Sequence, residues 1–168
     1  MGFSDAVSSF FNKYAVFKGR SSRSEYNYAR IFMYLSSFIL SIISSIESYY
    51  NIYSHNEYGF YSPLSSIVHI LFIISVIIPS ISLFIRRLHD LNFSGWWFWL
   101  WPAVVIFAFA LIFRDSLFTS WAVSGLLLFL VVSEVLLMCI RGTVGPNRFG
   151  PDPLATGGPE QAPVPASE

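Results

Sequence analysis

Charged and amide side chains gather in three short polar segments of this chain, residues 19–26, 86–90 and 142–153. Guanidinium groups offer forked donors that suit phosphate or carboxylate, while imidazole and carboxylate groups can exchange protons. The side chains in these segments that could do such chemistry form what we call the polar cluster: Arg20, Arg23, Glu25, Arg86, Arg87, His89, Asp90, Asn147, Arg148 and Asp152.

Two interpretations of the polar cluster stay open. In the first, its three carboxylates neutralise three of its arginines and lock the helix ends together, and the other arginines reach lipid phosphates. In the second, its five arginines exceed its three carboxylates, and glycine turns in 142–153 expose backbone amides, so the cluster binds an anionic lipid headgroup or a small phosphorylated ligand. Asp90 is expected to hold one or more of Arg20, Arg23 and Arg148.

Catalysis by the polar cluster would need side chains that converge. His89 beside Asp90 supplies the residue types of a histidine base that a carboxylate orients, yet neighbouring residues on a helix point about 100° apart. The sequence contains no HExxH, DxD, GxSxG or Walker-type motif. We therefore assign no catalytic residue and keep a lipid-modifying enzyme centred on this pair as the third hypothesis. Because Cys139 is the single cysteine, an internal disulfide and a multi-cysteine zinc site are excluded, and no cofactor or metal is expected.

Two further ionisable residues, His69 and Glu134, lie inside apolar stretches, where such residues are functional candidates by default. Their depths differ by roughly 20 Å at about 1.5 Å per residue, so a direct proton relay between them is excluded. For Glu134 the preferred interpretation is a structural ion pair with a partner among Arg86, Arg87 and Arg141. The alternative is a small transporter or channel in which Glu134 is the coupling or lining residue.

The elements that carry these residues are predicted to be membrane helices. Only 12% of the residues are charged, against 54% hydrophobic and 18% aromatic, whereas about a quarter of the residues of a soluble domain are charged. A helix needs about 20 apolar residues to cross a bilayer. We expect an all-α bundle of about four transmembrane helices, with spans at about 29–50, 64–86, 95–113 and 116–140.

Loop charges predict the orientation, because Lys and Arg are retained in the cytoplasm during insertion. Nine of the ten basic residues lie before the first span, between the second and third, or after the fourth. The tenth, Arg114, lies beside Asp115 in the opposite turn. Tyrosines such as Tyr58 and Tyr61 crowd the outer loop, and tryptophans open the third span at the inner face. Both termini are therefore expected in the cytoplasm.

The two ends of the chain are expected to differ from the membrane domain, residues 19–153. Apolar residues at spacings of three and four over residues 1–18 predict an amphipathic helix that lies in the inner interface or, alternatively, packs against the underside of the bundle. Residues 154–168 are rich in proline and offer little to bury, which predicts a disordered tail. The net charge is zero and no basic run occurs, so a nucleic-acid partner is not expected.

The three polar segments resemble the signature of a bacterial inner-membrane family known as domain of unknown function 805. That signature has an FxGRxSRxEYW-like start, an RRLHD segment followed by SGWW, and a GPNRFGPDP-like end. The match covers about residues 17–153; the second and third motifs are complete, and Asn27 stands where the family more often has Trp. The resemblance implies a multi-pass inner-membrane protein and brings no activity with it.

The leading hypothesis is a non-enzymatic scaffold or accessory subunit whose polar cluster contacts anionic lipid headgroups, a membrane-protein partner or further copies of the chain. Its rivals make different structural predictions. A transporter predicts a polar cavity that reaches Glu134, and an enzyme predicts a cleft at the inner interface lined by His89. A scaffold predicts neither feature.

Overall fold

The chain is all-helical over the residues that the computed structural model describes, 1–53, 64–112 and 117–155. Within these ranges the all-α prediction is confirmed. Tyr58 and Tyr61 of the outer loop, the turn at Arg114 and Asp115, and the tail beyond residue 155 lie outside the described residues. The elements are α1 (Phe3–Asn12), α2 (Arg23–Tyr53), α3 (Leu64–Asp90), the 3-10 helix η1 (Gly95–Trp99), α4 (Leu100–Ile112) and α5 (Leu117–Cys139).

Among the described residues, three helical segments are long and apolar enough to cross a membrane: Arg23–Tyr50, Leu64–Asp90 and Trp121–Cys139. At a rise of about 1.5 Å per residue, each exceeds or approaches the roughly 30 Å of the hydrocarbon core. The fourth apolar segment, Gly95–Leu111, is shorter. It begins as η1, where the Ser94 hydroxyl accepts a hydrogen bond from the backbone N–H of Trp96, and continues as α4.

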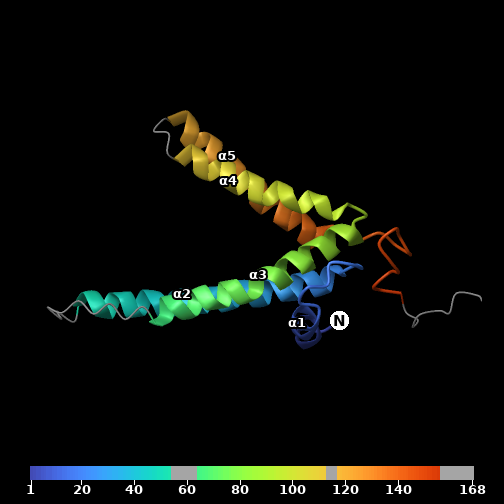
Figure 1. Ribbon diagram of the computed structural model, residues 1–168, viewed down its shortest axis with the longest axis horizontal. Coiled ribbons are helices and arrows are strands. Elements are labelled where there is room, and N and C mark those ends of the chain that lie inside the picture. The colour runs from blue at the N-terminus through green and yellow to red at the C-terminus, as the bar shows by residue number, and fades with distance from the viewer. Residues whose placement is uncertain (54–63, 113–116, 156–168) are drawn as a thin grey trace, which may run out of the picture.

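Helices α2 to α5 form two arms, as Figure 1 shows, one of α2 and α3 and the other of α4 and α5. The arms diverge from the end at which the polar segments lie, and α2 contacts α5 where the arms meet. Buried apolar side chains hold this junction together: Phe10, Tyr26, Ala29, Met33, Leu83, Phe84, Leu88 and Leu137.

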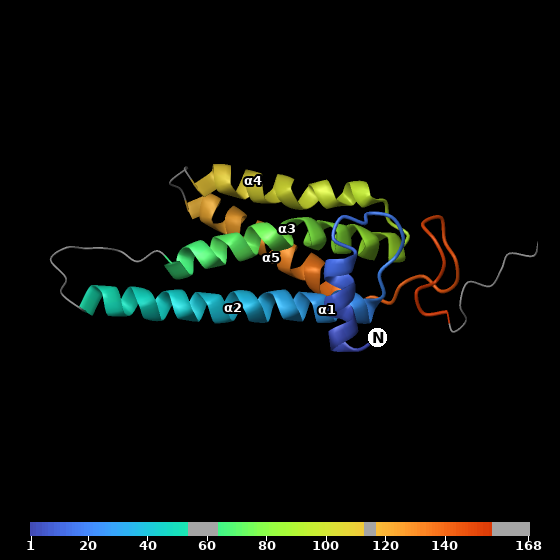
Figure 2. The same ribbon diagram turned by 60° about the horizontal axis from the view of Figure 1, so that its bottom comes forward.

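Helix α1 lies across the first turns of α2 (Figure 2) and packs on α2 and α3. It ends at Asn12, before the predicted limit of residue 18. Beyond it, the Lys13 carbonyl accepts a hydrogen bond from the Ser82 hydroxyl at 3.1 Å, so the backbone follows α3 instead of continuing the helix. The packing face of α1 consists of the buried residues Ala6, Ser9 and Phe10.

A proline inside α3 gives the segment after α1 a point of attachment. Pro79 has no N–H, so the carbonyl of Ser75 four residues earlier has no partner within the helix. The Tyr14 hydroxyl donates a hydrogen bond to that carbonyl at 2.9 Å. The proline therefore supplies an acceptor that ties the N-terminal segment to α3.

The first two polar segments adjoin capped helix ends. Helix α2 begins at Arg23, earlier than the predicted start near residue 29, because the Ser22 hydroxyl caps it by accepting the N–H of Glu25 at 3.2 Å. Helix α3 ends at Asp90, and Asn92 in the turn that follows has a left-handed conformation with φ of 63°. The N–H groups of Asn92 and Phe93 bond back to the last turn of α3, as in a Schellman motif.

Candidate functional site

Side chains from α2 and α3 cap the C-terminal end of α5. Arg87 donates hydrogen bonds to the carbonyls of Leu137, at 2.9 Å, and of Ile140. The two carbonyls between them accept from Asn27, at 3.2 Å, and from Arg23, at 3.2 Å. The last carbonyls of a helix lack partners in that helix. These three side chains supply the missing donors, and the two arginines place positive charge at the negative end of the helix dipole.

The third polar segment caps the C-terminal end of α3. Thr143 donates to the carbonyl of Asp90 through its N–H at 2.9 Å and through its hydroxyl at 3.0 Å. The side-chain amide of Asn147 donates to the carbonyl of His89 at 2.9 Å. Residues 142–153 are therefore folded onto the end of α3, which brings the second and third segments into contact.

The Asp90 carboxylate lies between two buried arginines, at 2.9 Å from Arg20 and 2.6 Å from Arg87. Arg20 also donates to two backbone carbonyls of the third segment. Gly142 packs so tightly against the same carboxylate that a Cβ at this position would overlap it. Asp90 thus joins all three polar segments.

Glu25 forms a second buried centre. Its carboxylate accepts hydrogen bonds from the Ser9 hydroxyl at 2.7 Å, from Lys13 at 3.2 Å and from Arg86 at 3.1 Å. The Arg86 side chain is 1% exposed, so its charge needs this carboxylate as a partner. The centre links α1, α2 and α3.

Only one of the three arginines predicted to bind Asp90 does so. Arg20 forms the expected ion pair. Arg23 instead caps α5, and Arg148 donates to the carbonyl of Asn92 at 2.9 Å. Backbone carbonyls at the helix ends lie closer to these two arginines than the carboxylate does, and Arg87 of α3 takes the second place at Asp90.

Glu134 is held at the junction of the arms by three side chains of α2. Its carboxylate lies 2.9 Å from Arg30 and accepts hydrogen bonds from the hydroxyls of Tyr26, at 2.9 Å, and Tyr34, at 3.3 Å. Arg30 also donates to the Tyr26 hydroxyl at 3.0 Å. These contacts form one network that connects α2 with α5.

The ion pair expected for Glu134 forms, but the predicted partners were the wrong arginines. Arg86 and Arg87 bond to carboxylates of the polar cluster, and Arg141 lies beyond the end of α5. Arg30 lies at the boundary of the predicted first span, 29–50, and in the structure it lies seven residues after the start of α2, on the face that contacts Glu134. His69, which was predicted together with Glu134 as a functional candidate inside a span, is half-buried on the first turns of α3.

Asp152 folds the third segment onto itself. Its carboxylate accepts hydrogen bonds from the backbone N–H groups of Leu154 and Gly145, each at 2.9 Å. These two bonds hold the pKa of the Asp152 carboxyl below its usual range, since they favour the charged form.

A cavity of about 440 Å³ opens beside this network. Its size lies in the range of small-ligand sites. Because Asp90 is already paired with two arginines, an anion in this cavity would meet Arg23 and Arg141 as its cations. The cavity is lined by Arg23, Asp90, Arg141, Gly142, Thr143, Val144, Asp152 and Leu154.

His89 faces away from the Asp90 network. Its Nδ1 lies 3.1 Å from the carbonyl oxygen of Gly19, and its ring stacks on Phe149 with 4.0 Å between the ring centroids. Both Asp90 carboxylate oxygens bond to arginines, so the two neighbours do not make a catalytic dyad. Within the described ranges, no group of three or more His, Cys, Asp or Glu side chains is placed to hold a metal ion.

The three polar segments lie almost wholly in the part of the chain that matches a known protein family. The family model described as a protein of unknown function (DUF805) matches residues 14–151, which include the first two polar segments and the third as far as Pro151. The chain belongs to the DUF805 family. It is 31% identical over 145 residues to inner membrane protein YhaI of Escherichia coli K12, covering 86% of this chain and 92% of that protein. It is 29% identical over 140 residues to inner membrane protein YhaH of the same strain, covering 83% and 88%.

No solved structure matches the chain. With inner-membrane relatives and, in the part of the chain that the structure describes, three helices long and apolar enough to cross a bilayer, this DUF805 protein is an integral inner-membrane protein. Within the family match, sequence reasoning missed Asn27, Thr143 and the Glu134 network. The spacing of Tyr26, Arg30 and Tyr34, every four residues on one face of α2, is the signal that could have revealed that network.

Proposed function

We propose that this DUF805 protein is a non-enzymatic scaffold or accessory subunit that crosses the inner membrane four times. Both termini lie in the cytoplasm, and the interlocked polar segments bind an anionic lipid headgroup at the inner leaflet. The observation that carries the proposal is the cavity in which Arg23 and Arg141 stand beside carboxylates that are already satisfied.

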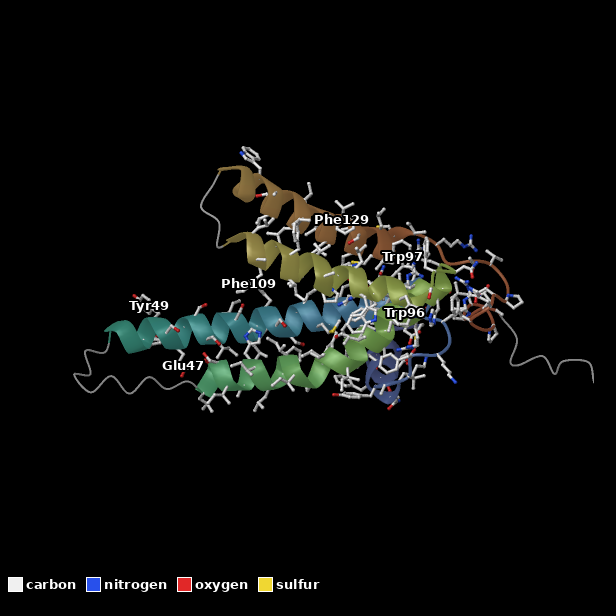
Figure 3. All side chains as sticks on the ribbon, turned by 45° about the horizontal axis from the view of Figure 1, so that its top comes forward. Glu47, Tyr49, Trp96, Trp97, Phe109 and Phe129 are labelled. Atoms are coloured by element: carbon white, nitrogen blue, oxygen red, sulfur yellow. The ribbon has the colours of Figure 1, made fainter. Side chains whose placement is uncertain are left out.

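The path of α4 supports a fourth crossing. Gly95 follows closely on the end of α3, whereas α4 leads to the far end of the second arm, where α5 begins (Figure 2). Tryptophan and tyrosine rings prefer the headgroup level of a bilayer. Trp96 and Trp97 lie at the polar end of the molecule and Tyr49 lies at the other (Figure 3), as expected for two interfacial belts.

The charge balance of the cavity supports an anionic ligand. Asp90 is neutralised by Arg20 and Arg87, and Asp152 is satisfied by backbone N–H groups. Lipid phosphates of the inner leaflet lie at this level when the spans are oriented by their basic residues. Arginine binds such phosphates through paired donors.

A scaffold is favoured over a transporter because the Glu134 carboxylate is held by an ion pair and hydrogen bonds. Its Oε1 atom has contacts with Arg30, Tyr26 and Tyr34, so moving an ion or solute past it would break a buried network. An enzyme centred on His89 and Asp90 is disfavoured because the two side chains face different partners. His89 does line a cavity of about 360 Å³, a feature that the enzyme hypothesis predicts and the scaffold hypothesis does not.

Binding of purified full-length protein to lipid tests the proposal. In native mass spectrometry, retention of phosphatidylglycerol or cardiolipin should exceed that of phosphatidylcholine, and Arg141→Gln should weaken it about tenfold, as for the loss of one charged hydrogen bond. Lys18→Gln removes the same charge from a residue outside the cavity and should change little. Inorganic phosphate as competitor separates a site for lipid from one for free phosphate. Equal retention by both variants would contradict the proposal.

Cysteine labelling tests the topology. In a Cys139→Ser background, a cysteine at Asn147 should react in intact cells only with a membrane-permeant reagent, whereas one at His55 should react with an impermeant reagent. External labelling at Asn147 would show that the orientation is inverted or that a span is missing.

A further inference from the structure

His89 lines a second cavity, of about 360 Å³, which the Asp90 network does not line. The cavity lies where the end of α3, η1 and the third polar segment meet. Its described lining contains four aromatic rings, those of Phe17, Trp96, Trp99 and Phe149. It differs from the arginine-lined cavity both in its walls and in its one titratable group.

The contacts of His89 fix its hydrogen-bonding pattern. The Gly19 carbonyl oxygen can only accept a hydrogen bond, so the Nδ1 atom of His89, 3.1 Å away, carries a proton. In the neutral ring, Nε2 then has a free lone pair and can only accept. Phe149 stacks on the ring with an interplanar angle of 7° and keeps the ring from turning.

Gly95 leaves open the space in front of this nitrogen. A Cβ at position 95 would lie 3.3 Å from Nε2 of His89 and 3.0 Å from a methyl group of Ile85. Gly95, Ile85 and His89 all line the cavity. The acceptor nitrogen therefore borders the space that a larger residue at this position would fill.

The charges around the cavity exclude most ligand classes. No carboxylate occurs among the described lining residues, and the Arg148 guanidinium lies 4.7 Å from the centre of the Phe149 ring. A cation would find no counter-charge and would be repelled by Arg148. An anion would face the lone pair of Nε2. A neutral ligand with an O–H donor satisfies both constraints, and a flat ring suits the aromatic walls.

We propose that this cavity binds the headgroup of a neutral, ring-bearing membrane amphiphile that carries a hydroxyl, of the phenol or quinol class. The hydroxyl donates to Nε2 of His89, and the ring packs against Trp96 and Trp99. These two side chains are 79% and 61% exposed, so a ligand can reach them from the interface. The oxidised quinone has only acceptor oxygens and would leave Nε2 without a donor, so the site distinguishes the reduced from the oxidised form.

Calorimetric titration of the purified full-length protein with decylubiquinol and decylubiquinone, without oxygen, tests this proposal. The wild type should bind the quinol about tenfold more tightly than the quinone, the effect of one hydrogen bond to a buried acceptor. His89→Phe keeps a ring on Phe149 and should abolish the preference. Gly95→Ala should weaken both probes, and so should Trp96→Ala, which alters an exposed side chain and leaves the packing intact.

Three results would overturn the proposal: equal affinities of the wild type for the two probes, a preference that persists in His89→Phe, or displacement of the quinol by phosphatidylethanolamine, which would indicate an ammonium site. Arg141→Gln, which targets the anionic-lipid cavity, should leave the quinol preference unchanged. The proposals for the two cavities can therefore be contradicted independently of each other.

Discussion

Arg87 donates a hydrogen bond from Nε to the carbonyl oxygen of Leu137 at 2.9 Å and so fastens the end of α3 to the end of α5. The same guanidinium reaches Ile140 and the carboxylate of Asp90. A single buried side chain thereby joins the two arms of the fold. The polar segments are held together by such hydrogen bonds to helix-end carbonyls as well as by ion pairs.

Arg87→Lys should destabilise the protein by about 2 kcal/mol. Lysine keeps the charge but lacks the planar fork, so it cannot bond to both carbonyls and the carboxylate at once. Thermal melting in detergent measures the loss. Arg148→Lys is the matched control, because Arg148 lies on the surface and makes one backbone hydrogen bond there, to Asn92. Equal melting temperatures for the two variants would show that the fork at position 87 is unimportant.

Gly142→Ala should destabilise by about 2 kcal/mol, because the new methyl group collides with the Asp90 carboxylate and forces it from its arginines. Gly125→Ala in α5 is the comparison. A Cβ there meets no atom within 4 Å, so that variant should be neutral or slightly more stable. If both substitutions were tolerated alike, the close packing of Gly142 on Asp90 would not exist.

Glu134→Leu should cost about 3 kcal/mol, since it leaves Arg30 buried without its carboxylate. The double variant Arg30→Leu with Glu134→Leu should recover most of that loss, because it removes both charges. Melting curves of the single and double variants decide this point. A folded Glu134→Gln protein that lost a measurable ion or solute flux would instead assign Glu134 to transport.

The third polar segment should loosen in acid. The pKa of Asp152 is lowered by the N–H groups of Leu154 and Gly145, so its charged form favours the folded segment. That contribution is present above the ordinary pKa of a free aspartate and is lost as the pH falls through the lowered value. The amide NMR shifts of Gly145 and Leu154 should titrate together over this acidic range. They should not do so in Asp152→Asn.

Much of the fold follows from the sequence because apolar runs of bilayer length permit few structures other than helices. The meeting of the three polar segments also follows, since each adjoins a helix end on the side rich in basic residues. Which carboxylate meets which arginine does not follow. It depends on how each helix is rotated about its axis, and a span that is apolar all round does not define that rotation.

The side chains that cap α5 could not be predicted from the sequence, for a different reason. Every residue has a backbone carbonyl, so the sequence does not show which carbonyls accept hydrogen bonds from side chains. The roles of Asn27 and Arg23 as donors to α5 become clear only when the helix ends lie beside one another. Likewise, Arg30 lies at the boundary of the predicted first span, and its contact with Glu134 depends on how α2 and α5 pack against each other.

The polar segments are expected to act as one unit around Asp90, and a double-mutant cycle between Asp90 and Arg20 measures that coupling. Melting of Asp90→Ala, Arg20→Ala and the double variant should give a coupling of about 2 kcal/mol, whereas the cycle between Asp90 and Arg148 should give a coupling near zero. Asp90→Ala should also be worse than Arg23→Ala, because two buried arginines lose their partner. Additive effects of Asp90→Ala and Arg20→Ala would show that the segments are separate and that Asp90 does not join them into one unit.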